Sequence, residues 1–365
     1  GGVLADEILT PGNGQVRALF VTGGNPLLTM PNAAKLRRAF QNLELLVTVD
    51  IYKNETGSLA HYVLPATSPF ERPDLPFIFP LMLGLQAKPY LQATRAIVEP
   101  AGEQRDEATI YLDLCRACDA PIFGSRIAQT ALGALRRAKG AVPQELVLDA
   151  LLRLSRSGGF SDLLSAHPHG KLRADHAPDA FLGHRVLTDD GKVSLAPDVL
   201  VEQAARRLET DFAREQQNRT RLKLISKRAI TTHNSWTHNI PEFVAGDKET
   251  NYVYVHPEDG ARLGLSDGAI ADVSSETATV RLPVKWLKDL MPGTVALPHG
   301  WGHQHAKGLG VASKTKGVNV NLLAADGPER LERVSGMAHL TGIVVDIKPA
   351  AGPRDVTSWS GIAGA

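Results

Sequence analysis

Cysteine is nearly absent from this chain of 365 residues, which contains only Cys115 and Cys118. A single C-x-x-C pair cannot supply the four thiolates of a structural zinc site or an iron–sulfur cluster. Both cysteines stand in an apolar segment with helical periodicity, residues 110–118, so we expect ordinary helix-packing thiols. A redox pair is the alternative. The sequence therefore predicts no metal ligands among its cysteines.

Net charge is also nearly absent, because Lys plus Arg number 40 and Asp plus Glu number 39. A chain this neutral lacks the basic excess with which proteins bind nucleic acid or anionic membranes regardless of sequence. No apolar run approaches the roughly 20 residues that cross a bilayer. We therefore expect a soluble chain with no membrane span and no nucleic-acid partner, located in the cytoplasm, in which any anion site is local.

The chain lacks an initiator methionine and a signal-like apolar segment, since it begins Gly1-Gly2-Val3. This start is typical of a piece of a longer protein or of a processed subunit. The length of 365 residues suggests two or three domains at about 150 residues each.

One stretch is rich in side chains that form hydrogen bonds: residues 226–239, reading S-K-R-A-I-T-T-H-N-S-W-T-H-N. Such a run cannot be the buried face of a strand or helix, because unpaired polar groups lose free energy away from water. It is either a solvated surface loop or a cradle for a polar ligand. The cations Lys227 and Arg228 at its start would suit an anion.

The first portion of the chain has an α/β pattern. Residues 16–22 predict a buried strand, which runs into the turn G-G-N-P at 23–26 and a helix at 33–40. The next strand, residues 43–49, ends at Asp50, at the sheet edge where doubly wound folds bind ligands. The turn is not G-x-G-x-x-G, so a plain connection and a strand-end cap stay open beside a nucleotide site.

The following residues predict less regular structure. Residues 62–64 predict a third short strand. The proline-rich residues 73–89 predict an irregular connection that serves as a substrate funnel or a subunit contact. The acids around residues 99–107 predict the start of a helix. Further helical patterns occur at residues 145–154 and 199–212.

The last portion predicts short strands separated by polar loops. Six such strands with one helical turn at residues 257–263 can bury a core only by closing into a small barrel. The strand patterns occupy residues 221–226, 252–256, 269–274, 278–284, 294–297 and 342–347.

Three histidines lie within seven residues in this portion: His299, His303 and His305. Their spacing is not H-E-x-x-H, no acidic residue stands near them in the sequence, and flanking glycines indicate a loop, so we expect no metal site. Trp301 and the imidazoles suit stacking on a flat heterocycle. The asparagines of residues 317–322 can offer donors and acceptors to its edge.

Several motifs occur in an order found in a known family. They are G-G-N-P at 23–26, V-D-I-Y-K-N-E-T at 49–56, A-H-Y-V-L-P at 60–65, S-K-R…H-N-S-W at 226–236, and H-P-E-D-G-A-R-L-G-L-S-D-G-A-I-A-D-V at 256–273. Together they resemble the C-terminal portion of the prokaryotic molybdopterin oxidoreductases, the family of formate dehydrogenases, nitrate reductases and dimethyl sulfoxide reductases.

The resemblance covers most of residues 16–110 and 221–347, and it implies an α/β plus β fold class. It implies a Rossmann-like α/β portion and a helical connecting segment, followed by a double-psi β-barrel that binds molybdopterin dinucleotide. The implied ranges are 1–125 for the α/β portion, 126–215 for the helical segment, 216–350 for the barrel domain and 351–365 for a C-terminal tail.

The resemblance also implies the residues that bind the cofactor, molybdopterin guanine dinucleotide with molybdenum or tungsten. Asp50 would accept two parallel hydrogen bonds from guanine, as a carboxylate can. The implied contacts are Gly24, Asn25, Asp50, Arg72 and Asp106 for one guanine dinucleotide, Arg228, Thr231, His233, Asn234, Ser235 and Trp236 for pyrophosphate and pterin, and Trp301, Asn319 and Asn321 for later pterin contacts, with Asn319 a possible one-turn shift of Asn321.

The chain departs from the family pattern in three places. It has no C-x-x-C-x-x-x-C motif and no residue that can be placed as the metal ligand, and H-N-S-W differs from the family H-W-H. The resemblance therefore implies that a missing N-terminal half or a companion subunit carries the metal ligand and a 4Fe–4S cluster. It also implies an electron-transfer partner and a small-molecule substrate. No catalytic residue can be assigned.

The function implied is two-electron redox chemistry of the formate dehydrogenase or nitrate reductase kind, with this chain as the cofactor-binding part. Three alternatives stay open. They are a non-redox hydratase or transhydroxylase of the same family, a nicotinamide-type dehydrogenase built on the Gly23 turn and Asp50, and a structural subunit without cofactor.

Overall fold

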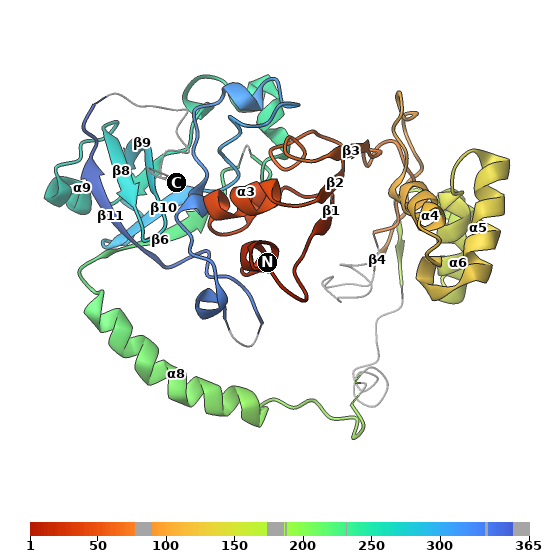
Figure 1. Ribbon diagram of the computed structural model, residues 1–365, viewed down its shortest axis with the longest axis horizontal. Coiled ribbons are helices and arrows are strands. Elements are labelled where there is room, and N and C mark those ends of the chain that lie inside the picture. Colours follow the sequence, from red (N-terminus) through yellow and green to blue (C-terminus); the bar gives the residue numbers. More distant parts are fainter. Residues whose placement is uncertain (77–89, 174–185, 187, 231, 333–334, 353–365) are drawn as a thin grey trace. The chain divides into compact units, whose positions relative to one another are not determined.

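The structure is a computed structural model that describes residues 1–76, 90–173, 186, 188–230, 232–332 and 335–352 (Figure 1). The chain divides into two compact units. Unit 1 comprises Gly1–Val63 together with Asp198–Ala365, and unit 2 comprises Leu64–Pro197. The domain ranges expected from the sequence stay a prediction.

Unit 1 begins with a small α/β layer. Its strands β1 (Ala18–Thr22) and β2 (Leu45–Asp50) are parallel, with Ala18 paired to Leu45, and β3 (Tyr62–Pro65) follows β2 in the sheet order. The connection from β1 to β2 contains α2 (Pro26–Thr29) and α3 (Ala33–Gln41). This β-α-β arrangement places the G-G-N-P turn and Asp50 at the same edge of the sheet.

Helix α3 forms because its sequence is capped and amphipathic. The Asn32 side chain accepts a hydrogen bond from Lys35 N at 3.2 Å and caps the first turn. Leu36 and Phe40 lie four residues apart on one face, and both are buried. They pack with α1 (Leu4–Leu9) and Leu46 of β2 in one hydrophobic cluster.

The first predicted strand was expected to be buried, and that part of the prediction is wrong. The residues of β1 alternate between exposed and partly buried, and Phe20 is 46% exposed. The reason is position: β1 is an edge strand that pairs only with β2, so one side of it has no sheet neighbour among the described residues.

The second part of unit 1 is a closed six-stranded barrel, as the sequence predicts. Its strand order is β10-β6-β11-β8-β9-β7, which closes on itself because β10 also pairs with β7. Two neighbouring pairs, β10 with β6 and β7 with β9, are parallel, and the others are antiparallel. The strands are β6 (Leu222–Lys227), β7 (Val253–Val255), β8 (Ile270–Ser274), β9 (Thr279–Trp286), β10 (Thr294–Pro298) and β11 (Ile343–Pro349).

Alternating side chains fill the barrel. On β8, Ala271 and Val273 point inward and are fully buried, while Asp272 between them faces out and pairs with Arg281 at 2.6 Å. The inward residues of all six strands are aliphatic and belong to one cluster. Helix α9 (Pro257–Leu263) follows β7, begins with proline and ends at Gly264 with φ +69°.

Two long connections leave the barrel and carry most of the polar residues that the sequence singles out. The first runs from β6 to β7 and contains the short 3-10 helices η3 (Trp236–Asn239), η4 (Pro241–Phe243) and η5 (Gly246–Lys248). The second runs from β10 to β11 and contains η6 (Ala312–Lys314), η7 (Val320–Leu322) and η8 (Pro328–Arg330). Helix α8 (Asp198–Gln217) precedes β6.

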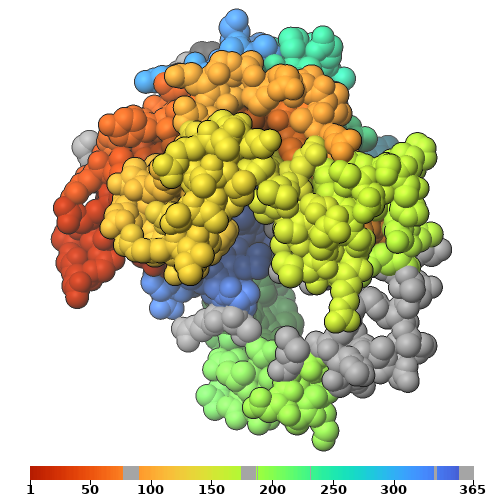
Figure 2. Space-filling view, turned by 90° about the vertical axis from the view of Figure 1, so that its right-hand side faces the viewer, coloured from red at the N-terminus to blue at the C-terminus, as the bar shows by residue number. Residues whose placement is uncertain are grey.

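Unit 2 is mainly helical. Figure 2 shows its helices α5 (Arg126–Lys139) and α6 (Gln144–Leu154) in yellow. Two short strands, β4 and β5, form an antiparallel pair. The elements are β4 (Tyr90–Leu91), α4 (Glu107–Ala117), η2 (Ile122–Gly124), α5 (Arg126–Lys139), α6 (Gln144–Leu154), α7 (Phe160–Ala166) and β5 (Lys171–Leu172).

Two predictions in unit 2 need correction. Helix α4 begins at Glu107 rather than near residue 99, because Asp106 caps its first turn through Thr109 N at 2.8 Å. Cys115 is partly buried but Cys118 is exposed at the C-cap, so the second cysteine does not pack in a helix interface. Most of the proline-rich connection lies outside the described residues.

Candidate functional site

The G-G-N-P turn and the loop after β2 are locked together by the side chain of Asn25. Gly23 has φ +56°, which lets the chain turn sharply after β1. Asn25 Oδ1 accepts hydrogen bonds from Thr56 N at 3.3 Å and Thr56 Oγ1 at 2.9 Å. Asn25 Nδ2 donates to Glu55 Oε2 at 2.5 Å. Asn25 therefore bridges two motifs that lie about 30 residues apart in the sequence.

Asp50 lies at the end of β2, at the sheet edge that the sequence predicts. Its carboxylate accepts hydrogen bonds from Tyr52 N at 3.1 Å and from Asn54 Nδ2 at 3.2 Å. Asn54 Nδ2 also lies 3.4 Å from the Gly24 carbonyl oxygen. The structure thus brings Gly24, Asn25 and Asp50 together, and their role as guanine dinucleotide contacts stays a prediction.

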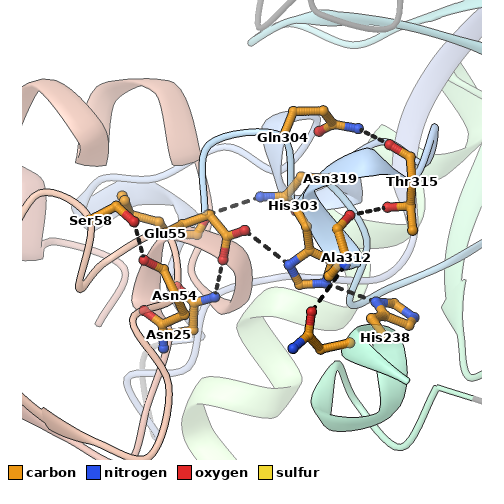
Figure 3. Close-up of polar contacts among 12 residues, drawn as sticks. Asn25, Asn54, Glu55, Ser58, His238, His303, Gln304, Ala312, Thr315 and Asn319 are labelled. Atoms are coloured by element: carbon orange, nitrogen blue, oxygen red, sulfur yellow. Dashed lines mark hydrogen bonds and ion pairs between the residues drawn. The ribbon is translucent and has the colours of Figure 1, made fainter. Parts of the chain in front are cut away.

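A buried chain of hydrogen bonds joins this edge to the barrel loops (Figure 3). Glu55 Oε1 lies 2.9 Å from His303 Nδ1, and His303 Nε2 lies 2.8 Å from His238 Nδ1. Glu55 and His238 are 0% exposed, and His303 is 1% exposed. The three residues come from the loop after β2, the β10–β11 connection and the β6–β7 connection.

His238 is an uncharged imidazole at neutral pH. Its pKa is lowered to about 3, first by burial and then by the neighbouring His303 and His299, while an interaction with the Gly300 backbone raises it in part. Its ring packs on Trp301 with 4.3 Å between the ring centroids. His238 Nε2 is buried without a hydrogen-bond partner among the described residues, and Trp301 Nε1 is in the same situation.

Part of the polar stretch is exposed to solvent beside this chain of hydrogen bonds, although Thr232 within it is buried. Arg228, His233, Asn234 and Trp236 are exposed, and no hydrogen bond from the side chains of Arg228, His233 or Asn234 occurs within the described part of the chain. His233 and Asn234 have backbone φ angles of +35° and +66°, which residues other than glycine seldom adopt. That this loop is a cradle for a polar ligand stays a prediction.

The loop is packed directly onto the second barrel connection at Gly300. A Cβ atom at this position would overlap the carbonyl oxygen of Asn234, and Gly300 also has φ +87°. Glycine is therefore required on two counts. Ser235 is partly buried at the start of η3, and Thr231 lies outside the described residues.

The later predicted contacts have structural roles. Trp301 was expected to offer its face to a heterocycle, but it is 3% exposed, and its face is covered by His238. Asn319 Nδ2 donates to Leu27 O at 2.9 Å, and Asn321 Nδ2 donates to Leu28 O at 2.6 Å. Both amides therefore hold α2 against the barrel, and cofactor contacts by these three residues stay a prediction.

Arg72 and Asp106 belong to unit 2, where they line one open hollow of about 560 Å³. Asp106 is engaged as the cap of α4, and Arg72 donates to Glu107 Oε2 at 2.5 Å. A second hollow, of about 1060 Å³, lies in unit 1 between α8 and the strands β6 and β11. None of the predicted cofactor-binding residues lines this second hollow.

The central residues of the buried chain were not predicted from the sequence. Glu55 is part of the V-D-I-Y-K-N-E-T motif but not one of the predicted contacts, and no acidic residue lies near His303 in the sequence. The one signal in the sequence was that Glu55 lies in the same motif as Asp50, a predicted cofactor contact. Within the described ranges, no group of three His, Cys, Asp or Glu residues is placed to hold a metal ion, and no helix is long and apolar enough to cross a membrane.

Comparison with known families agrees with this arrangement. Residues 4–117 match the family described as Molybdopterin oxidoreductase, and residues 222–340 match the Molydopterin dinucleotide binding domain. Together the two matches cover more than half of the chain. The chain belongs to the molybdopterin oxidoreductase family, of the dimethyl sulfoxide reductase-like kind, and its β domain is a double-psi β-barrel.

Two similar proteins are much longer than the part of them that this chain matches. A trimethylamine-N-oxide reductase of Haemophilus influenzae is 23% identical over 332 residues, which cover 81% of this chain and 38% of that protein. The NADPH-Fe(3+) oxidoreductase subunit alpha of Geobacter sulfurreducens is 24% identical over 315 residues, which cover 86% of this chain and 29% of that protein. The chain thus spans well under half the length of these relatives.

The solved structure of acetylene hydratase from Pelobacter acetylenicus shares the fold. It superimposes with a TM-score of 0.66 and 20% sequence identity over 95% of this chain and 46% of that chain. At this identity the likeness shows the fold alone.

The residues of unit 1 fit a molybdopterin dinucleotide. Arg228 is an exposed cation beside polar side chains that are not engaged with the rest of the described chain, and such a donor set suits pyrophosphate. The close contact of Gly300 with the Asn234 carbonyl oxygen fixes the backbone of that loop against the second barrel connection. The buried acceptor at His238 Nε2 suits the N–H groups of a heterocycle.

Proposed function

We propose that this chain is the cofactor-binding C-terminal part of a molybdenum or tungsten enzyme that transfers two electrons between a small substrate and an electron-transfer partner. The observation that carries the proposal is the join between the two matched regions. Within unit 1, Asn25 and Glu55 of the α/β layer meet His303 and His238 of the barrel connections in one hydrogen-bonded chain.

When bound, the bis-molybdopterin guanine dinucleotide cofactor would supply the metal centre at which substrate is oxidised or reduced. The residues of this chain have other tasks. Arg228, with the exposed His233 and Asn234, would hold the anionic pyrophosphate through charge-assisted hydrogen bonds. Asp50 would accept from the guanine base. Hydrogen bonds from the barrel connections to the pterin would orient it and shift the metal's potential.

The metal ligand and a 4Fe–4S cluster would come from a chain segment or companion subunit outside these residues. Support comes from the length of the matched relatives and from the name of one of them, which is a subunit alpha. We place formate dehydrogenase-like or nitrate reductase-like redox chemistry first, because the relatives matched over most of the chain are named as oxidoreductases.

The test is chemical analysis of the protein as isolated from its native cells with the chains that accompany it. We expect molybdenum or tungsten by elemental analysis, a fluorescent pterin after oxidation, and guanosine monophosphate after hydrolysis. Bound nicotinamide nucleotide without metal would replace the proposal by a dehydrogenase, and absence of every cofactor would indicate a structural subunit. A metal-loaded protein that hydrates its substrate without accepting or donating electrons would indicate a non-redox member.

A further inference from the structure

The direction of every hydrogen bond in the buried chain can be worked out from one backbone group. Thr56 N–H can only donate, so the Asn25 side-chain atom it contacts, at 3.3 Å, must be the carbonyl oxygen. The Thr56 hydroxyl agrees, since it accepts from Leu27 N at 3.4 Å and its proton is left to donate to the same Asn25 oxygen. The Asn25 amide is thereby fixed with its NH₂ group toward Glu55.

The donor and acceptor of each following hydrogen bond can then be assigned in turn. Asn25 Nδ2 donates to Glu55 Oε2, and the other carboxylate oxygen accepts from His303 Nδ1–H. A neutral imidazole that donates through Nδ1 must accept through Nε2. His303 Nε2 therefore accepts from His238 Nδ1–H, at 2.8 Å. The remaining nitrogen, His238 Nε2, carries no proton and is a hydrogen-bond acceptor.

His238 Nε2 is the last atom in this chain of hydrogen bonds. It is buried and has no hydrogen-bond partner among the described residues. A buried acceptor without a donor costs roughly 1–3 kcal/mol. The fold nevertheless uses three buried polar side chains to hold this nitrogen in its acceptor form, next to the loop of Arg228 to Trp236. An acceptor prepared in this way selects a guest that offers an N–H or O–H group.

We propose that Glu55 and His303 are positioning residues that fix the tautomer of His238, so that His238 Nε2 accepts a hydrogen bond from an N–H or O–H donor of the bound cofactor. The identity of the cofactor as the guest rests on the proposed function. The tautomer assignment rests on the hydrogen bonds alone. Glu55 thus acts on the ligand through two imidazoles and does not touch it.

Few titratable or charged groups among the described residues surround the hydrogen bonds of Glu55, His303 and His238. His299 faces His238, and His305 faces Glu55. Arg228 lies beside His299, and Arg37 lies beside His305. A charged His303 would donate through both nitrogens and force His238 into the opposite tautomer, which makes the two states distinguishable. The measurement belongs at pH 8, where an ordinary histidine side chain is neutral.

The experiment is two-bond ¹H–¹⁵N NMR of the full chain labelled with ¹⁵N-histidine at pH 8, with resonances assigned through His238→Asn and His303→Asn. We expect His238 and His303 to be Nδ1–H tautomers. An Nε2–H tautomer at His238 in the unsubstituted protein overturns the proposal, whether or not any variant folds.

The isosteric variant Glu55→Gln gives the sharper result. Asn25 still requires an acceptor, so the new amide must direct its oxygen to Asn25 and its NH₂ to His303 Nδ1. Both imidazoles should then invert, and His238 Nε2 should become protonated. Glu44→Gln, which changes an exposed glutamate paired with Arg17, is the matched control and should leave both tautomers as they were. Unchanged tautomers in a folded Glu55→Gln protein contradict the proposal.

The origin of the donor is tested by comparing the His238 ¹⁵Nε2 resonance in cofactor-containing and cofactor-free protein. A change on cofactor removal supports the proposal. If removal has no effect but Trp301→Phe moves the resonance, the indole N–H is the donor and the cofactor contact is wrong. If the protein never contains cofactor, the proposed function fails while the tautomer assignment stands or falls separately.

Discussion

Glu55 Oε1 and His303 Nδ1 are 2.9 Å apart although 248 residues separate them in the chain. The first residue follows β2 in the α/β layer, and the second follows β10 of the barrel. Their contact is fully buried, so it ties the two regions that match separate family descriptions into one unit. The α/β layer and the barrel would therefore already be held together before a cofactor that contacts both of them binds.

Removal of the carboxylate at Glu55 should destabilise unit 1 strongly. In Glu55→Ala the Asn25 amide and His303 Nδ1–H both lose their acceptor in a buried place, which we expect to lower the free energy of unfolding by about 3 kcal/mol. The measurement is urea unfolding followed by tryptophan fluorescence. Glu44→Ala, at an exposed ion pair, is the control and should leave the midpoint unchanged. Equal midpoints in the two variants would show that the buried chain contributes nothing.

The lowered pKa of His238 should make unit 1 less stable in acid. The pKa is about 3 in the folded protein, mainly because of burial, and about 6.5 in an unfolded chain. Between these values the unfolded state binds a proton that the folded state does not. Stability should therefore be fully present above pH 6.5 and fall by up to about 1.4 kcal/mol per pH unit below it.

His299 and His305 should also make the protein less stable as pH falls, because burial lowers their pKa values too. The His238 contribution can be isolated by urea unfolding of wild type and His238→Asn at pH 7.5, 6 and 5. We expect the variant to lose stability less steeply with falling pH. Parallel curves for the two proteins would rule out His238 as a source of the acid sensitivity.

Replacement of Gly300 should disrupt the packing of the polar loop. Gly300→Ala combines a positive φ, worth about 1–2 kcal/mol, with overlap between the new Cβ and the Asn234 carbonyl oxygen. Gly268→Ala is a matched control, since Gly268 has φ +80° but open space where a Cβ would lie. Thermal unfolding should show a larger loss for Gly300→Ala, together with weaker cofactor retention. Similar losses in both variants would mean that only backbone conformation matters.

Arg228 should act on cofactor retention without affecting the fold. It is exposed, so Arg228→Ala should leave the unfolding midpoint unchanged, while loss of a charge-assisted contact to pyrophosphate should weaken cofactor binding about tenfold or more. Arg219→Ala, which removes another exposed cation of unit 1, provides the comparison. Metal and pterin content after gel filtration measures the effect. Full retention in Arg228→Ala would remove this residue from the site.

Local patterns in the sequence predicted the elements of the fold well. The aliphatic alternation of β8 and the proline and glycine at the ends of α9 specify those elements within a few residues, and the closed barrel followed from their number. The edge position of β1 was not predictable, because hydrophobicity reports the side chains of a strand and not its neighbours. The acids at residues 99–107 indicate a helix N-terminus without fixing its first residue, which the cap formed by Asp106 places at Glu107.

The candidate site was predicted only in part, for a physical reason. Gly24, Asn25 and Asp50 follow strand ends at one sheet edge, so their proximity could be inferred from the sequence. The contact of Glu55 with His303 depends on how the barrel packs against the α/β layer, and no periodicity encodes that. The burial of Trp301 by His238 was missed for the same reason.

The most direct test of the account is the cofactor content of the native protein isolated with its accompanying chains. The account predicts molybdenum or tungsten together with pterin and guanosine monophosphate in constant proportion, and a parallel loss of all three in Arg228→Ala. A protein that contains none of them, or that binds a nicotinamide nucleotide instead, would contradict it.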